Sequence, residues 1–175
     1  DADDRLERVR HSMSHVMAEA VLQMFPTAQI AIGPAIDNGF YYDFDLPRAL
    51  TEEDLEEITE RMKTIIQEDK EFKRIVVSRD EAKKLFAGQV YKMELIDAIP
   101  PDEDVSLYNQ GGFTDLCRGP HVGSTKELNP DAFKLLSTAG AYWRGRETNP
   151  MLTRIYATAW ANPKDLRLHL QKLTE

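Results

Sequence analysis

The fold of this chain is decided by residues 28–46, which read AQIAIGPAIDNGFYYDFDL. Two runs of apolar and β-forming residues flank Asp37-Asn38-Gly39, and an Asn-Gly step between such runs is typical of a β-hairpin. Gly33-Pro34 should break or bulge the first strand and let the backbone approach a ligand closely. Because side chains alternate along a strand, the aromatic residues at 40, 42 and 44 share one face and are expected to pack across strands.

Periodicity and capping residues predict the other elements. We expect helices over residues 4–25, 51–69, 78–86, 91–96 and from 162 onward. We expect strands over residues 72–77 and 105–108 and β-rich segments over 133–145 and 151–160. Together with the hairpin they predict an α+β domain with a largely antiparallel sheet and covering helices.

The composition is that of one globular domain. The chain has 175 residues, 42% of them hydrophobic. No apolar run approaches the ~18 residues that span a bilayer, and the charged start lacks the apolar centre of a signal peptide. A single cysteine excludes an intramolecular disulfide framework, so we expect a soluble cytoplasmic protein without membrane contact. Since the chain starts without Met in a helical segment, we expect a fragment of a longer protein.

The net charge of −8 disfavours a broad surface for duplex nucleic acid. Residues 51–71 alone hold nine acidic residues against Arg61, Lys63 and Lys70, a net of −6 that leaves −2 for the rest. An acidic helix on one side does not prevent a local basic mouth elsewhere. The charge therefore permits capture of a nucleic-acid end.

The helix expected over residues 4–25 carries a histidine pair. Its apolar residues recur at three- and four-residue steps and form one stripe: Val9, Met13, Val16, Met17, Ala20 and Met24. His11 and His15 lie one turn apart on the opposite side of the helix. Flanked by small residues, the pair can line a cleft if another element covers it.

A second motif, DLCRGPH over residues 115–121, adds a cysteine and a third histidine. Cys117 and His121 are separated by Gly119-Pro120, which forces a turn that can still fold both side chains inward. Asp115 lies on the same face as Cys117 if that segment is extended. The two motifs contain three of the four histidines and the only cysteine.

Three kinds of chemistry fit these residues. The first is a tetrahedral Zn²⁺ site, whose four ligands would be His11, His15, Cys117 and His121. Such sites rarely combine three histidines with one cysteine, and four protein ligands leave no position open for water. The second is a metal-free hydrolytic pocket, in which the imidazoles, Asp115 and Lys92 hold and activate water. The third is a cysteine nucleophile beside histidine. From its own surroundings in the sequence, Lys92 has the pattern of a surface lysine.

Longer segments resemble one protein family. They are HSMSH (residues 11–15), AIGPAIDNGFYYDF (31–44), YKMELI (91–96), DLCRGPHV (115–122), TAGAYWRG (138–145) and MLTRIYATAW (151–160). The segments fall in the same order as in bacterial-type threonyl-tRNA synthetases, and the match covers nearly the whole chain. The histidine and cysteine pairs are also shared with the editing domains of alanyl-tRNA synthetases, whereas GAYWRG and RIYATAW favour the threonyl family.

The resemblance implies an editing domain of the threonyl/alanyl-tRNA synthetase second-additional-domain type over residues 1–161. Residues 162–175 would start a linker helix toward a class II catalytic domain. The implied reaction is hydrolysis of mischarged seryl-tRNA(Thr), and the partner is the acceptor end of tRNA(Thr) carrying serine. A methyl group gives only about 1–3 kcal/mol of discrimination, so a synthetic site faced with serine needs a second sieve. The absent catalytic domain would use ATP and Zn²⁺, and the full-length parent would dimerise through absent domains.

The family's editing site corresponds to six residues of this chain: His11, His15, Lys92, Asp115, Cys117 and His121. The resemblance places Gly33 and Tyr42 near the substrate and implies no metal. We expect His11 and Lys92 to place and activate water, and Cys117 to line the pocket. The roles left to His15, Asp115 and His121 are to orient the terminal adenosine and the seryl group.

Four arginines are candidates for phosphate contact near the acceptor end: Arg118, Arg144, Arg146 and Arg154. Pairing with the many acidic residues is the alternative role for each. Two alternative functions also remain open, namely alanyl-type editing of seryl-tRNA(Ala) and a non-catalytic, zinc-stabilised tRNA-binding module.

Overall fold

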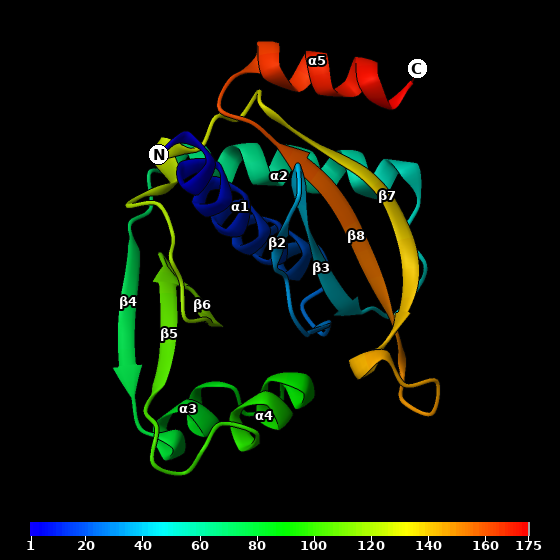
Figure 1. Cartoon of the computed structure of the whole chain (residues 1–175). Helices are drawn as coiled ribbons and strands as arrows, with labels where there is room; N and C mark the ends of the chain where they lie inside the picture. The colour runs from blue at the N-terminus through cyan, green and yellow to red at the C-terminus, as the bar shows by residue number, and fades with distance from the viewer. Residues whose placement is uncertain (175) are drawn as a thin grey trace.

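A computed structural model describes residues 1–174 of the chain as two antiparallel sheets with helices between and around them (Figure 1). The α-helices are α1 (Ala2–Met24), α2 (Glu52–Gln67), α3 (Arg79–Leu85), α4 (Val90–Asp97) and α5 (Pro163–Leu173). Two short 3₁₀ helices are η1 (Thr125–Glu127) and η2 (Trp143–Gly145). The strands are β1 (Gln29–Ile30), β2 (Ala35–Ile36), β3 (Gly39–Asp45), β4 (Phe72–Val77), β5 (Val105–Gln110), β6 (Phe113–Leu116), β7 (Phe133–Tyr142) and β8 (Met151–Ala159).

The larger sheet has the strand order β1-β3-β8-β7, and β2 also pairs with β3. The predicted hairpin forms its first part. Ile36 faces Gly39 across the turn, where Asn38 takes the left-handed conformation (φ +64°) that asparagine tolerates. Gly33-Pro34 separates β1 from β2, as predicted. On β3 the alternate residues Phe40, Tyr42 and Phe44 are all buried against the core.

The smaller sheet consists of β4, β5 and β6 in that order. Gln110 faces Phe113 across a turn at Gly111-Gly112. One face of this sheet packs on α3 and α4 through a second cluster of buried residues: Ala82, Phe86, Ile96, Val105 and Leu107.

Helix α1 lies between the two sheets (Figure 1). The predicted apolar stripe packs into the main core with α2 and the larger sheet. From Val9 to Val21 nearly every side chain of α1 is buried, including the charged residues Arg10 and Glu19. Glu19 pairs with Lys70 at 2.7 Å, which gives this buried carboxylate the partner it requires. The side of α1 that carries the histidines is therefore covered by other elements, as a cleft lined by this pair requires.

Helix α4 connects the two halves of the molecule. The Tyr91 hydroxyl donates to Asp45 on β3 at 2.7 Å, and the Trp143 indole donates to Glu94 at 2.9 Å. At the start of the helix, the Val90 N–H donates to the side chain of Gln29 at 2.8 Å. These bonds fix the rotation of an eight-residue helix that would be marginal alone.

The predicted capping residues start two of the helices. Thr51 and Asp54 form a complete capping box at α2, and Ser78 caps α3 through the Glu81 N–H. The segment over residues 91–96 is helical, as expected. In α5 only Leu166 is buried, and His169 packs against Trp160 with ring centres 5.1 Å apart. Within residues 1–174 no helix has the combined length and apolar content that a membrane crossing requires.

Truncation of the buried face of α1 should destabilise the fold. Met17 is fully buried in the main core, so Met17→Ala should lower the free energy of unfolding by about 2–5 kcal/mol. Leu85→Ala, at a side chain that is 59% exposed, should change it by less than about 0.5 kcal/mol. Urea denaturation followed by circular dichroism measures both values. Equal losses in the two variants would contradict the central position of α1.

Candidate functional site

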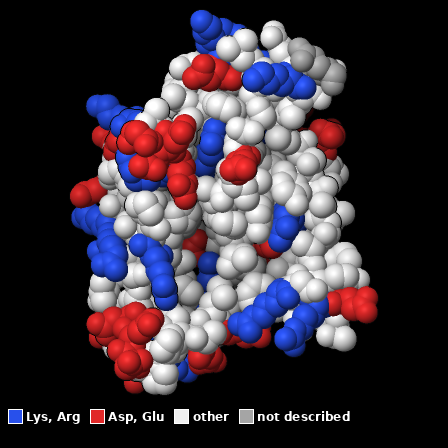
Figure 2. Space-filling view, viewed as in Figure 1, with Lys and Arg blue, Asp and Glu red and all other residues white. Residues whose placement is uncertain are grey.

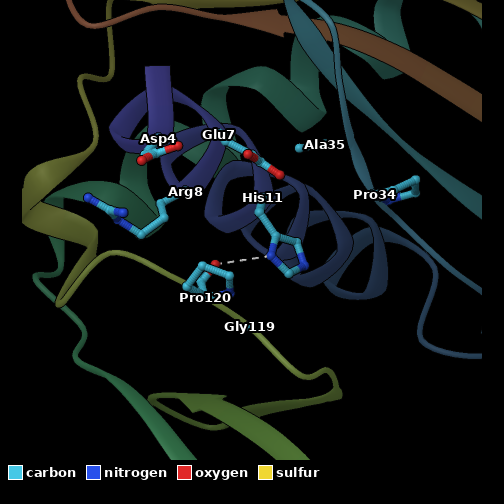
Figure 3. Close-up of a pocket in the computed structure, with 8 residues that line it drawn as sticks. All are labelled: Asp4, Glu7, Arg8, His11, Pro34, Ala35, Gly119 and Pro120. Atoms are coloured by element: carbon cyan, nitrogen blue, oxygen red, sulfur yellow. Dashed lines mark hydrogen bonds between the residues drawn. The ribbon is translucent and has the colours of Figure 1, made fainter. Parts of the chain in front are cut away.

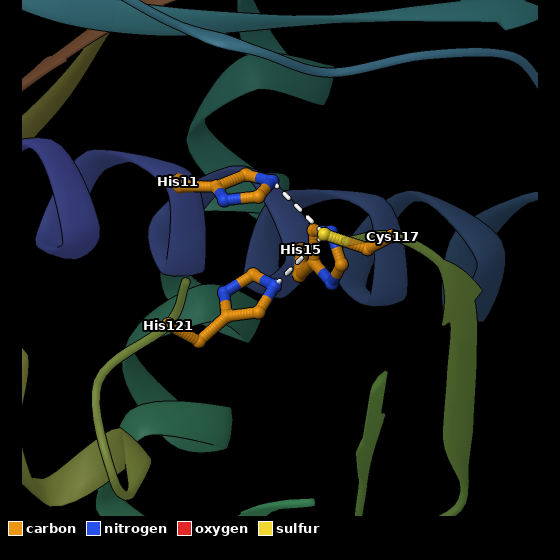
Figure 4. Close-up of side chains that lie close together, drawn as sticks. All are labelled: His11, His15, Cys117 and His121. Atoms are coloured by element: carbon orange, nitrogen blue, oxygen red, sulfur yellow. Dashed lines mark hydrogen bonds between the residues drawn. The ribbon is translucent and has the colours of Figure 1, made fainter. Parts of the chain in front are cut away.

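The two sequence motifs meet in space. His11 and His15 come from α1, and Cys117 and His121 come from the loop that follows β6. One potential ligand atom from each side chain lies within 4.8 Å of those of the other three (Figure 4). The sequence prediction that these four residues share one site is therefore consistent with the geometry.

The turn between Cys117 and His121 depends on glycine. Gly119 has φ +84°, and a Cβ atom there would overlap the Tyr108 hydroxyl. The Gly119 N–H donates to the Cys117 sulfur at 3.1 Å, while the Cys117 N–H donates to the Ser106 carbonyl at 3.2 Å. Glycine at the centre of the turn therefore lets the backbone fold both side chains toward α1.

His121 lies at the centre of a stack of rings. It stacks on His11 with ring centres 4.3 Å apart and on Phe72 at 5.0 Å. His15 and Tyr108 approach it edge-on at 4.3 and 4.4 Å. Such packing leaves the imidazole little freedom to rotate.

Hydrogen bonds hold the outer nitrogen of two imidazoles. His11 Nδ1 lies 3.1 Å from the Pro120 carbonyl oxygen, and His121 Nδ1 lies 2.9 Å from the Ser12 hydroxyl. The inner nitrogens, Nε2 of His11 and Nε2 of His121, each lie 3.3 Å from the Cys117 sulfur. Both rings therefore direct Nε2 toward one point beside this sulfur.

Burial keeps this cluster uncharged. It lowers the pKa of His11, of His15 and of His121, and the neighbouring imidazoles lower the pKa values of His15 and His121 further. Burial also raises the pKa of the Cys117 thiol to about 12. At neutral pH the histidines are therefore bases, while Cys117 remains a thiol. This disfavours the cysteine nucleophile, because thiolate is the reactive form.

A buried ion pair lies behind the histidines. Lys92 Nζ is 2.6 Å from Asp115 Oδ1, and both side chains are 2% exposed. The Tyr42 hydroxyl donates to Asp115 Oδ2 at 2.6 Å and accepts from Lys92 at 3.0 Å, which closes a triangle. Burial and then Asp115 raise the pKa of Tyr42 well above its ordinary value, so the hydroxyl keeps its proton. His15 Nε2 approaches Asp115 Oδ2 at 3.5 Å and links the triangle to the cluster.

Lys92 is not the surface residue that its local sequence indicates. Helix α4 directs it inward, because Tyr91 and Glu94 on the same helix are tied to the larger sheet and to η2. The Leu116 N–H also donates to Asp115 Oδ1 at 2.8 Å. The ammonium group of Lys92 is tolerated at this depth because Asp115 and Tyr42 are its partners.

Gly33 supports the triangle from below. A Cβ atom on Gly33 would overlap the ring of Tyr42, so any other residue would displace this tyrosine. The Gly33 carbonyl accepts from the Ser14 hydroxyl at 2.8 Å, which ties the hairpin to α1. Of the two residues that the resemblance places near the substrate, Tyr42 contacts Lys92 and Asp115, and Gly33 contacts Tyr42.

The arginines predicted to contact phosphate have different surroundings. Arg118 is 81% exposed and lies 3.5 Å from Glu103 at the outer side of the loop. Arg154 forms a two-pronged pair with Asp43 at 2.8 and 3.0 Å, so here the alternative role holds. Arg144 and Arg146 are exposed near η2.

A pocket of about 340 Å³ opens on His11 (Figure 3). Its walls come from the first turns of α1, the hairpin at Pro34 and the turn at Pro120. Glu7 and Arg8 contribute charge of both signs. A second pocket of about 280 Å³ reaches Cys117 from the side of α4. Of the four clustered residues, the first pocket is lined by His11 and the second by Cys117.

Several residues complete the site that the sequence did not single out. Ser12 and Ser14 lie within the first histidine motif, where no local pattern in the sequence indicates a role for their hydroxyls. Both are fully buried and both form hydrogen bonds across to the other segments of the site. Phe72 and Tyr108 contact His121 from the smaller sheet, and no local signal in the sequence indicates that.

The donor set also has features of a metal site. Imidazole and thiolate are the ligands that Zn²⁺ prefers, and the outer bonds of His11 and His121 are those that orient metal-bound histidines. Cys117 would have to lose its proton, and His15 would have to turn Nε2 or Nδ1 toward the ion. The residues therefore fit zinc in type, with these two adjustments.

Comparison with known proteins finds a similar domain over part of the chain. Residues 105–156 match the model of the family described as threonyl and alanyl tRNA synthetase second additional domain. The matched segment contains β5, β6, the Cys117–His121 turn, β7 and most of β8. It confirms the predicted fold type.

The comparison with whole sequences is more particular. The chain is 59% identical over 170 residues to the threonine–tRNA ligase of Dehalococcoides mccartyi, covering 97% of this chain and 29% of that protein. It is 53% identical over 174 residues to the threonine–tRNA ligase of Staphylococcus aureus, covering 99% of this chain and 27% of that protein. The chain thus spans less than a third of the length of these relatives. Its sequence is therefore similar to part of these ligases, and residues 105–156 within it match the second additional domain.

Acidification should destabilise the folded chain. Burial lowers the histidine pKa values, so below the ordinary value of about 6.5 the unfolded chain binds more protons than the folded one. The contribution of these histidines to the free energy of unfolding is therefore fully present above about pH 6.5, and it is lost as the pH drops toward the folded pKa values. His121→Gln should reduce this slope by up to about 1.4 kcal/mol per pH unit in urea denaturation.

His169→Gln, outside the cluster, is the matched control and should keep the slope of the unchanged chain. Identical slopes in all three proteins would show that His121 does not titrate as its burial requires.

Proposed function

We propose that this domain hydrolyses the ester of seryl-tRNA(Thr). The observation that carries the proposal is the position of His11: a neutral, hydrogen-bonded imidazole that lines an open pocket and lies against His15, which approaches the buried lysine–aspartate pair. The similarity to threonine–tRNA ligases supplies the substrate class, since an ester-hydrolysing site in such a protein serves to remove a wrong amino acid.

His11 is the base that takes a proton from water. Its Nδ1–H is held by the Pro120 carbonyl, so Nε2 carries the lone pair. That lone pair faces only the Cys117 thiol at 3.3 Å, a weak donor that a water molecule can replace. The activated water attacks the seryl carbonyl carbon and the ester C–O bond breaks. The proton held by His11 passes to the departing ribose oxygen, so serine and a ribose hydroxyl leave.

Lys92 supplies a donor for the developing negative charge. Its ammonium group has three N–H bonds, and the contacts among the described residues use two, to Tyr42 and Asp115. The third is left for water or for the carbonyl oxygen of the substrate. Because Asp115 neutralises the charge of Lys92 within the protein, this donor exerts little attraction on the phosphates of tRNA.

Discrimination between serine and threonine requires a close wall. Tyr42 is held rigidly between Gly33 and the Lys92–Asp115 pair, so it cannot retreat to accommodate a methyl group. An overlap of this kind excludes a substrate more strongly than the ~1–3 kcal/mol that a methyl group contributes by favourable contact. His15 and His121 would orient the terminal adenosine and the seryl group.

The charge distribution is compatible with a tRNA end. Figure 2 shows a hollow in the middle of this face, with basic side chains on both sides of it and acidic side chains both beside it and farther out. We assign phosphate contact near the acceptor end to the exposed Arg118, with Arg144 and Arg146 as further candidates. A few such contacts suit a single-stranded end better than a duplex.

The chain would act as part of a larger cytoplasmic protein. We propose residues 1–161 as the editing domain and residues 162–175 as the start of a linker toward a catalytic domain. The relatives are more than three times longer and are named as ligases, so ATP, Zn²⁺ and dimerisation would belong to the remaining domains.

Deacylation assays test the proposed function. The chain should release serine from seryl-tRNA(Thr), and leave threonyl-tRNA(Thr) and seryl-tRNA(Ala) largely intact. His11→Ala should lower kcat by about 10²–10⁴-fold, the range typical for loss of a general base. His169→Ala, on the terminal helix, should retain the full rate. Preferred turnover of seryl-tRNA(Ala) would favour alanyl-type editing, and no turnover of any ester would refute the proposal.

A zinc-stabilised, non-catalytic tRNA-binding module is the second candidate, and the close approach of four ligand atoms favours it. On our proposal, protein treated with a chelator keeps its deacylase rate and its unfolding temperature. One zinc per chain in purified protein, together with a fall of both quantities on chelation, would reverse the choice.

A further inference from the structure

Ser12 occupies a position between the histidine cluster and the loop that follows Cys117. Its side chain is fully buried. The hydroxyl lies 2.9 Å from His121 Nδ1 and accepts from the Val122 N–H at 3.0 Å. Since the Ser12 oxygen already accepts from Val122, its role toward His121 depends on whether the Ser12 hydroxyl proton points at Nδ1.

The tautomer of His11 is set by the backbone. The Pro120 carbonyl can only accept, so His11 Nδ1 must carry the proton and Nε2 must be bare. A bare Nε2 can only accept, and the donor that faces it is the Cys117 S–H. The thiol proton is thereby directed to His11.

The same thiol then biases the state of His121. Once its single proton points at His11, the sulfur can only accept from His121 Nε2, and because sulfur is a weak acceptor this contact favours a proton on that nitrogen without fixing it there. In a neutral imidazole Nδ1 is then bare and needs a donor. Ser12 is the donor in contact with it. The opposite arrangement would leave the Ser12 O–H buried without an acceptor among the hydrogen bonds of residues 1–174, which is costly.

We propose that Ser12 is a positioning residue that fixes His121 in the Nε2-protonated tautomer. The two stacked imidazoles are thereby held in opposite tautomers, since a backbone carbonyl makes His11 Nε2 an acceptor and a serine hydroxyl makes His121 Nε2 a donor. Both nitrogens lie 3.3 Å from the same sulfur. On the proposed function, on which this inference rests, one nitrogen takes the proton of the water and the other donates to the substrate oxygen.

Nitrogen-15 NMR of histidine-labelled protein, treated with a chelator and held at neutral pH, reads the tautomers directly. We expect Nδ1–H for His11 and Nε2–H for His121 in the unchanged chain. In Ser12→Ala the Nδ1 atom of His121 loses its donor, so His121 should shift wholly or partly to Nδ1–H. His121 as Nδ1–H in the unchanged chain, or an unaltered tautomer in Ser12→Ala, would overturn the assignment.

Kinetics provide the second readout. Ser12→Ala should lower kcat for seryl-tRNA(Thr) by about tenfold or more, the size seen when outer partners of metal-bound histidines are removed, with KM little changed. Ser137→Ala, on the exposed part of β7, is the matched control and should keep both values. A loss confined to thermal stability, with kcat preserved, would reduce Ser12 to a packing residue. If the unchanged chain hydrolyses none of the esters, the proposed function is wrong, while the NMR result still decides the role of Ser12.

Discussion

The contact between Lys92 and Asp115 is the interaction on which the rest of the site depends. Both charged groups are almost fully removed from water, and the pair is tolerated there because hydrogen-bonding partners surround it. These partners are Tyr42, His15 and the Leu116 N–H. Because these groups come from β3, α1 and β6 while Lys92 comes from α4, satisfying one ion pair draws both sheets and two helices to a common point.

This arrangement separates charge from the reacting groups. The carboxylate and the ammonium neutralise each other behind the cluster, while the half-buried His11 and His121 direct their ring nitrogens at neutral groups. Burial then holds both imidazoles neutral and Cys117 as a thiol. A site built in this way offers bases and donors for hydrolysis at neutral pH, and places them where a pocket opens to solvent.

Local patterns in the sequence were sufficient for much of the fold. The three- and four-residue spacing predicted α1, the Asn-Gly step predicted the first hairpin, and Thr51 and Asp54 predicted the start of α2. Residue types too rare to be accidental, three histidines and one cysteine in two motifs, located the site. These features are readable because each depends on neighbours within a turn or two of the chain.

Other features depend on partners distant in sequence, so no local pattern contains them. Lys92 has the pattern of a surface residue and is buried because Asp115, 23 positions later, lies beside it. The division into two sheets follows from long-range pairing of β3 with β8 and of β4 with β5. Arg154 is held by Asp43, 111 positions away. The hydroxyl of Ser12 acquires its role only when the turn after Cys117 folds over α1.

A crystal structure with a stable amide analogue of 3′-seryl-adenosine is the most direct measurement of whether this cluster is a deacylation site. We expect the seryl group to lie between Tyr42 and His11, with its carbonyl carbon next to a water molecule held by His11 Nε2 and its carbonyl oxygen within hydrogen-bond distance of Lys92 or His121. An analogue bound away from the histidines, or bound with its carbonyl group directed out of the pocket, would contradict the proposed chemistry.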